Sequence, residues 1–163
     1  MLKQVSFRVI EDNDKDYLKA LYADSRAREM NMTVWSDQEK TRFLDQQYEF
    51  QDRSFTLNYI GAIRRIIQLD GRDIGRLFIN EADDHMRILD LTIHSDYQRR
   101  GIATDILKSL LNKAYGGKVP VKLSVVHDNP ARRLYTRLGF HLVRQDGLYV
   151  EMIWRPDLTP REV

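Results

Sequence analysis

The fold is decided by Ile88-Leu89-Asp90-Leu91-Thr92-Ile93 and the turn Gln98-Arg99-Arg100-Gly101-Ile102-Ala103 that follows it. The first segment is apolar and predicts a strand, and the second opens a stretch with helical spacing of apolar residues. A strand that leads through a basic, glycine-bearing turn into a helix forms a phosphate cradle, because the first N–H groups of a helix lack partners and carry partial positive charge. Gly101 lets an anion approach the backbone closely. This order indicates a cofactor-binding enzyme.

Regular patterns flank the turn on both sides. The helix after Gly101 keeps one apolar face through Ala114 and ends at Gly116-Gly117. Before the turn, signals at Asp70-Gly71 and Asp83-Asp84 separate three strands, which predicts an antiparallel meander. These strands are expected at residues 63–69, 74–80 and 86–93.

The N-terminal part predicts a strand and two helices. A strand at residues 5–10 precedes a helix from about Asp14 to Arg28. Ser36 and Glu39 form a capping-box pattern that starts a second helix. The apolar side of this second helix is expected to carry Phe43, Leu44, Gln47 and Phe50.

The C-terminal part adds a strand, a short helix and a hairpin. The strand is expected at residues 121–126, the helix after Asn129-Pro130, and the hairpin around Asp146-Gly147. The element order is therefore β-α-α-β-β-β-α-β-α-β-β. It predicts an α/β fold with a mixed sheet, in which only the strands joined by the residue 102–116 helix need be parallel.

Composition restricts the class of protein. The 163 residues suit one domain, and the formal charge of +2 argues against bulk coating of nucleic acid. The absence of cysteine excludes disulfides and thiolate chemistry, and the four histidines show no metal-ligand spacing, so no metal is expected. No apolar run approaches the roughly 20 residues of a membrane span, and Met1 to Ile10 lacks an apolar signal core. A cytoplasmic protein that binds no membrane is expected.

A second motif gives the turn a family context. The turn lacks the glycine spacing of a P-loop or a dinucleotide fingerprint, and by itself it could be a solvated helix entrance. After the next strand runs Asn129-Pro130-Ala131-Arg132-Arg133-Leu134-Tyr135-Thr136-Arg137-Leu138-Gly139-Phe140. The two motifs in this order closely resemble the GNAT superfamily of N-acetyltransferases, over about residues 60–154. The N-terminal 55 residues match only in element order.

The resemblance implies a single GNAT-like acyl-CoA N-acyltransferase domain over residues 1–163, with acetyl-CoA as co-substrate. In such enzymes the turn binds the coenzyme A pyrophosphate through backbone N–H groups, and the preceding strand pairs with the pantetheine arm. The cofactor-binding residues that it implies are Leu91, Thr92, Ile93, Gln98, Arg99, Arg100, Gly101, Ile102, Ala103, Thr104, Asn129, Ala131 and Arg132.

The resemblance also implies that Tyr135 is the general acid toward the leaving thiolate, since a phenol with a pKa of about 10 can protonate it. The alternative is a core aromatic residue at helical spacing beside Leu134 and Leu138. For the base, Asp90 is the best candidate because a carboxylate inside an apolar strand is unusual. Alternatively, Asp90 forms a salt bridge with an arginine such as Arg87 or binds a cationic substrate. Glu81 and bulk water are weaker candidates.

The sequence is also compatible with other functions. A non-catalytic acyl-CoA sensor would keep the same fold, and Tyr135 speaks weakly against it. A nucleic-acid module is disfavoured by the low net charge, although Arg99, Arg100, Arg132, Arg133 and Arg137 are all basic. The acceptor is an amine of a small molecule, peptide or protein; similar folds build its pocket from the poorly matched N-terminal helices. A homodimer is common among similar enzymes.

Overall fold

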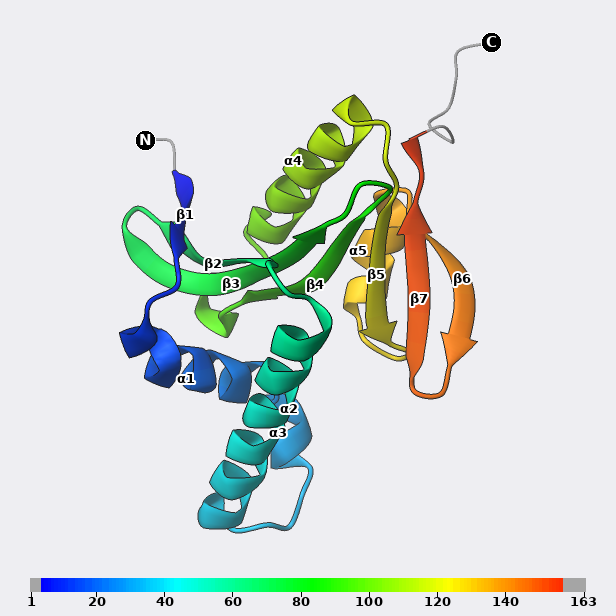
Figure 1. Cartoon of the computed structure of the whole chain (residues 1–163). Helices are drawn as coiled ribbons and strands as arrows, with labels where there is room; N and C mark the ends of the chain where they lie inside the picture. The colour runs from blue at the N-terminus through cyan, green and yellow to red at the C-terminus, as the bar shows by residue number, and fades with distance from the viewer. Residues whose placement is uncertain (1–3, 157–163) are drawn as a thin grey trace. The chain divides into compact units, whose positions relative to one another are not determined.

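The computed structural model describes residues 4–156, so both ends of the predicted 1–163 domain lie outside the described part. Two compact units are evident in it. Unit 1 runs to Phe78 and takes in Asp90–Arg100, and unit 2 comprises Ile79–Leu89 and the chain from Gly101. Within the described residues, seven strands form a mixed sheet in the order β1-β2-β3-β4-β5-β7-β6 (Figure 1). Strands β3 (Arg72–Glu81) and β4 (Met86–Ile93) each contribute residues to both units.

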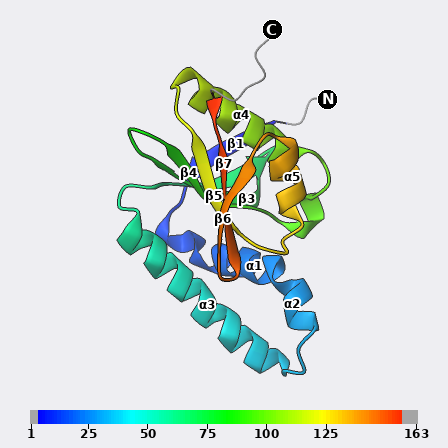
Figure 2. The same cartoon turned by 90° about the vertical axis from the view of Figure 1, so that its right-hand side faces the viewer.

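Unit 1 contains the predicted N-terminal strand and helices. Figures 1 and 2 both show α1 lying next to α3, and the apolar cluster of Leu18, Tyr48 and Ile66 joins α1, α3 and β2. Its elements ahead of β3 are β1 (Val5–Val9), the 3-10 helix η1 (Asp12–Asp14), α1 (Lys15–Ser25), α2 (Ala27–Asn31), α3 (Asp37–Asn58) and β2 (Ile63–Leu69).

The capping box at the start of α3 is confirmed. The Ser36 hydroxyl accepts from the Glu39 backbone N–H, and the Glu39 carboxylate accepts from the Ser36 N–H, each at 3.1 Å. The predicted buried side of this helix is wrong in part. Tyr48 is buried, whereas Phe50 is 71% exposed. The position of α1 selects the buried face of α3, which a weak apolar periodicity does not specify.

The first predicted helix is divided into two. Helix α1 ends at Ser25, and Arg26 has φ −107° and ψ 4°, outside the helical region. The Arg26 N–H still donates to the carbonyls of Tyr22 and Ala23. The chain then continues in the short helix α2, so the helix expected through Arg28 contains a break that side-chain spacing does not reveal.

Unit 2 agrees closely with the predicted elements. Helix α4 (Ile102–Gly116) buries Ile102, Ile106, Leu107, Leu110, Leu111 and Ala114, as its periodicity predicts. Strand β4 pairs in parallel with β5 (Val121–Val126), and β5 pairs antiparallel with β7 (Tyr149–Trp154). The short helix α5 (Ala131–Arg137) and the edge strand β6 (His141–Asp146) complete the unit. In residues 4–156, no helix is both long and apolar enough to cross a membrane.

A charge network holds the N-terminal segment of unit 1. The Arg8 guanidinium donates to both carboxylate oxygens of Asp14, at 2.9 and 2.8 Å, and to both of Asp73, at 3.2 and 2.8 Å. Asp14 also accepts from the Glu11 N–H. The Arg8 side chain and that backbone hydrogen bond lower the pKa of Asp14 to about 2. The ionised form of Asp14 is therefore favoured in the folded chain.

We expect this network to weaken in acid. Because the folded pKa of Asp14 lies below its ordinary value of 3.8, its contribution is complete above about pH 4 and is lost as the pH falls toward 2. In urea unfolding, Asp14→Asn should cost roughly 2 kcal/mol at pH 6, and the difference from wild type should close near pH 2. Glu49→Gln, at an exposed pair with Lys15, is the control and should change little. A gap of constant size from pH 6 to 2 would contradict the assignment.

Candidate active site

Strand β4 presents Asp90 and Thr92 on one face in unit 1. The Thr92 hydroxyl donates to Asp90 Oδ1 at 2.9 Å, as expected for residues two apart in a strand. The other carboxylate oxygen accepts a short hydrogen bond from Nε of Arg76 in β3. Both oxygens of the predicted base are therefore engaged within the protein, and the salt-bridge alternative raised for Asp90 is confirmed.

The arginine that pairs with Asp90 is not the one suggested from the sequence. Arg87 bonds instead to Glu151 of β7. Residues 87 and 90 are separated by an odd number of positions, so a strand places them on opposite faces. Arg76 could have been suspected, because it interrupts the apolar run of a neighbouring strand much as Asp90 interrupts its own. Glu81, the weaker candidate base, accepts from Lys113 at 2.6 Å.

Strands β3 and β4 approach each other closely beside this pair. A Cβ atom added to Gly75 would lie 2.2 Å from the Thr92 carbonyl oxygen, closer than any real contact of this kind. Glycine at position 75 therefore allows the backbone at Thr92, in the predicted pantetheine strand, to take its place. The signal that could have pointed to Gly75 is a single glycine inside a predicted strand, which often marks a close approach of another backbone.

The segment that leads into the predicted phosphate turn is held by side chains. Asp24 of α1 accepts from the backbone N–H of Ser95 at 2.9 Å and from its hydroxyl at 2.7 Å. These bonds fix the 3-10 helix η2 (Ser95–Tyr97). The Gln98 amide donates to the Ile93 carbonyl at 2.9 Å, and Arg100 donates to the Asp96 carbonyl at 3.1 Å. The Arg100 side chain thus folds back onto the chain that precedes it.

The turn ends at Gly101, which opens unit 2. Gly101 has φ +79°, a left-handed conformation that favours glycine, and it stands at the N-cap of α4. Space around it is open, since an added Cβ would have no neighbour within 4 Å. The first helical bond of α4 runs from the Asp105 N–H to the Gly101 carbonyl. The N–H groups of Ile102, Ala103 and Thr104 precede that bond, and a glycine N-cap has no side chain to cap them.

The second motif forms the start of α5 in unit 2. The Asn129 side chain accepts from the Ala131 N–H at 2.9 Å, and Arg132 donates to the His127 carbonyl at 2.6 Å. Tyr135 is half-buried. Its ring packs edge to face against that of Phe140, with 5.7 Å between the ring centroids. Asn129 and Arg132 therefore fix the local chain in this structure.

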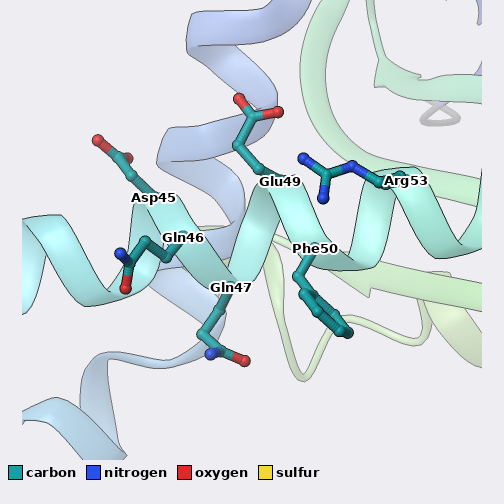
Figure 3. A pocket seen from close by; sticks show the side chains of 6 residues that line it. All are labelled: Asp45, Gln46, Gln47, Glu49, Phe50 and Arg53. Atoms are coloured by element: carbon teal, nitrogen blue, oxygen red, sulfur yellow. The ribbon is translucent and has the colours of Figure 1, made fainter.

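A hollow elsewhere contains none of the predicted site residues. It lies along α3, and Figure 3 shows its side chains pointing in different directions from that one helix. Its lining consists of Asp45, Gln46, Gln47, Glu49, Phe50 and Arg53. Glu49 is already paired with Lys15 and Lys19 of α1. The hollow is distinct from both motifs.

Comparison with known families agrees with the two motifs. The model of the GNAT acetyltransferase family matches residues 10–140. The chain belongs to the GNAT acetyltransferase family. The match starts well before residue 60, so the N-terminal helices belong to the family region too. A comparison with curated protein sequences gives no match.

Solved structures show the same fold at low identity. A PaiA N-acetyltransferase from Thermoplasma acidophilum, solved with coenzyme A, is 16% identical with a TM-score of 0.68, over 93% of this chain and 99% of that one. The ribosomal-protein-S18-alanine N-acetyltransferase of Escherichia coli is 17% identical with a TM-score of 0.61, over 99% of each chain. Naa50 of Arabidopsis thaliana, with the bisubstrate analogue CoA-Ac-MVNAL, is 14% identical with a TM-score of 0.59, over 91% and 96%. The mixed-sheet GNAT fold is thus confirmed.

The contact at Gly75 yields a stability prediction. Gly75→Ala should destabilise the protein by about 1–3 kcal/mol, because the new methyl group would push β3 away from the Thr92 carbonyl. Denaturant unfolding measures the loss, and amide exchange should accelerate at Thr92. Gly116→Ala is the matched control, since an added Cβ there meets nothing within 4 Å, and it should be neutral or slightly stabilising. Equal stability of the two variants would refute the close approach.

Proposed function

We propose that this GNAT-family chain is an acetyl-CoA-dependent N-acetyltransferase that acetylates a primary amine. The observation that carries the proposal is the left-handed Gly101 at the start of α4, within a region that matches the family. Open space at the glycine and the uncapped N–H groups behind it suit a diphosphate. Acetyl-CoA would supply an activated thioester; the residues of the chain bind, orient and exchange protons.

Backbone groups do most of the binding in this proposal. The N–H groups of Arg100 to Thr104 hold the pyrophosphate, and the backbone of Leu91, Thr92 and Ile93 pairs with the pantetheine arm. The turn residues Gln98 and Arg99, together with Asn129, Ala131 and Arg132 at the start of α5, complete the binding set. An N–H at Leu91 or Thr92 stabilises the oxygen of the reacting carbonyl.

Two side chains carry the protons. The amine nitrogen forms a bond to the acetyl carbon as the carbon–sulfur bond breaks. Asp90 takes the proton that the amine loses or orients the amine for attack, and the Tyr135 hydroxyl gives a proton to the departing sulfur. Asp90 then releases its proton to solvent and the Tyr135 phenolate takes one up, so a neutral amine and acetyl-CoA give the amide and the free thiol with both side chains restored.

Acetyl-CoA binding tests the proposal directly. Calorimetric titration should show saturable binding of acetyl-CoA to the wild type. Gly101→Ala should weaken it about tenfold, because a side chain is strained at φ +79° and would enter the cradle. Gly147→Ala is the matched control: φ is +63°, the surroundings are equally open, and the residue lies in the β6–β7 turn. The absence of saturable binding by the wild type would overturn the proposal.

Turnover separates an enzyme from a sensor. We expect acetyl-CoA with a panel of amines (ethanolamine, a pentapeptide with N-terminal alanine, and lysine amide acetylated at its α-nitrogen) to release free thiol. Tyr135→Phe keeps the ring contact with Phe140 but loses the hydroxyl, so kcat should fall on the order of 100-fold while acetyl-CoA affinity changes little. Tyr115→Phe, at the exposed end of α4, is the control. Binding without thiol release from any amine would favour the sensor, and an unchanged kcat in Tyr135→Phe would exclude the general-acid role.

A further inference from the structure

Arg76 is a charged residue in an apolar environment. It is 4% exposed and lies in the stretch of β3 from Ile74 to Ile79 in which every residue is buried. Within residues 4–156, Asp14 is the only other buried residue with a charge. Removing a guanidinium from water is costly unless charged and polar groups surround it. The partners of Arg76 therefore indicate what the residue does.

Three elements of unit 1 supply these partners. Nε donates to Asp90 of β4, and a terminal guanidinium nitrogen donates to the Gln51 side-chain oxygen of α3 at 2.5 Å. The guanidinium carbon lies 4.7 Å from the centroid of the Phe78 ring, a cation–π distance. The planar guanidinium thus points hydrogen bonds in fixed directions, which a lysine ammonium does not reproduce.

Two hydrogen bonds fix the Asp90 carboxylate. Arg76 binds one carboxylate oxygen and the Thr92 hydroxyl binds the other, so the carboxylate plane is fixed relative to the backbone of β4. Beside Arg76, Gly75 brings β3 against the Thr92 carbonyl. Two consecutive residues of β3 thus set the positions of two residues of β4 that the proposed function uses.

Stability alone does not account for such a group. Replacing a buried ion pair with apolar side chains of similar volume is often neutral or stabilising. An apolar pair would also fill this space, but it would not orient a carboxylate. The directional contacts of Arg76 therefore suit a role in geometry more than one in stability.

We propose that Arg76 is a positioning residue of the acetyl transfer, which orients the Asp90 carboxylate in β4 and is itself held by Gln51 of α3. This inference rests on the proposed function, in which Asp90 takes the proton of the amine or orients the amine. Arg76 acts through Asp90 and touches neither substrate. Its effect should therefore appear in kcat and depend on Asp90.

A double-mutant cycle tests this dependence. Thiol release from acetyl-CoA is measured with the panel amine that the wild type acetylates fastest, and acetyl-CoA affinity is measured by calorimetry. Arg76→Lys and Asp90→Asn should each lower kcat about tenfold, with acetyl-CoA affinity within twofold of wild type. The double variant should be no slower than Asp90→Asn alone, because the two residues act as one unit. Effects that multiply to about 100-fold, or a wild-type kcat in either single variant, would overturn the inference.

Two further variants distinguish a specific effect of Arg76 from a general loss of folding. Arg64→Lys is the matched control: Arg64 lies 5.3 Å from the same Phe78 ring but pairs with Asp52 at 3.3 Å, so kcat should stay at the wild-type value. If Arg76→Lys does not fold, Gln51→Glu takes its place in the test, because it gives the Arg76 guanidinium a second carboxylate to bind. Gln51→Glu should lower kcat when Asp90 is present, and it should have no effect on kcat when it is combined with Asp90→Asn. A normal kcat for Gln51→Glu would then reject the inference. Failure of the wild type to acetylate any amine would reject the proposed function instead.

Discussion

The contact between β3 and β4 at Gly75 and Arg76 is the constraint on which the candidate site in unit 1 depends. Gly75 has no side chain, so the Thr92 carbonyl can occupy the space where a Cβ would lie. The next residue places a buried positive charge against Asp90. Without that carboxylate the guanidinium would keep only uncharged partners, the Gln51 side-chain oxygen and the Phe78 ring, so its charge would be poorly compensated. The strand that the proposed function assigns to pantetheine is thus shaped by two adjacent residues of its neighbour.

The predicted phosphate turn depends chiefly on backbone geometry. Gly101 adopts a left-handed conformation, and the segment before it is held by Asp24 and by the Gln98 side chain. Arg100 donates to the Asp96 carbonyl and lies over the Tyr97 ring, which directs its charge back along the chain. An anion at this turn would therefore meet N–H groups before the Arg100 side chain.

Regular patterns in the sequence predicted the fold well where burial follows a simple period. All six apolar residues expected on one face of α4 are buried, and the capping box of α3 forms as expected. Prediction was weaker where tertiary contacts choose among local alternatives. The exposure of Phe50 depends on which side of α3 packs against α1, and the break at Arg26 is not marked by the spacing of apolar residues.

The sequence by itself determined the order of elements apart from the division of the first helix, the parallel pairing of β4 with β5, the glycine turn ahead of α4 and the unusual position of Asp90. These features arise from local periodicity, turn chemistry and connection length, and residues close together in the sequence determine all three. Tertiary structure alone decided that Asp90 pairs with Arg76 rather than Arg87, that Gln51 joins them, and that Gly75 is needed against Thr92. The physical reason is that these contacts join residues 14 to 25 positions apart, and only strand pairing and helix packing bring such residues together.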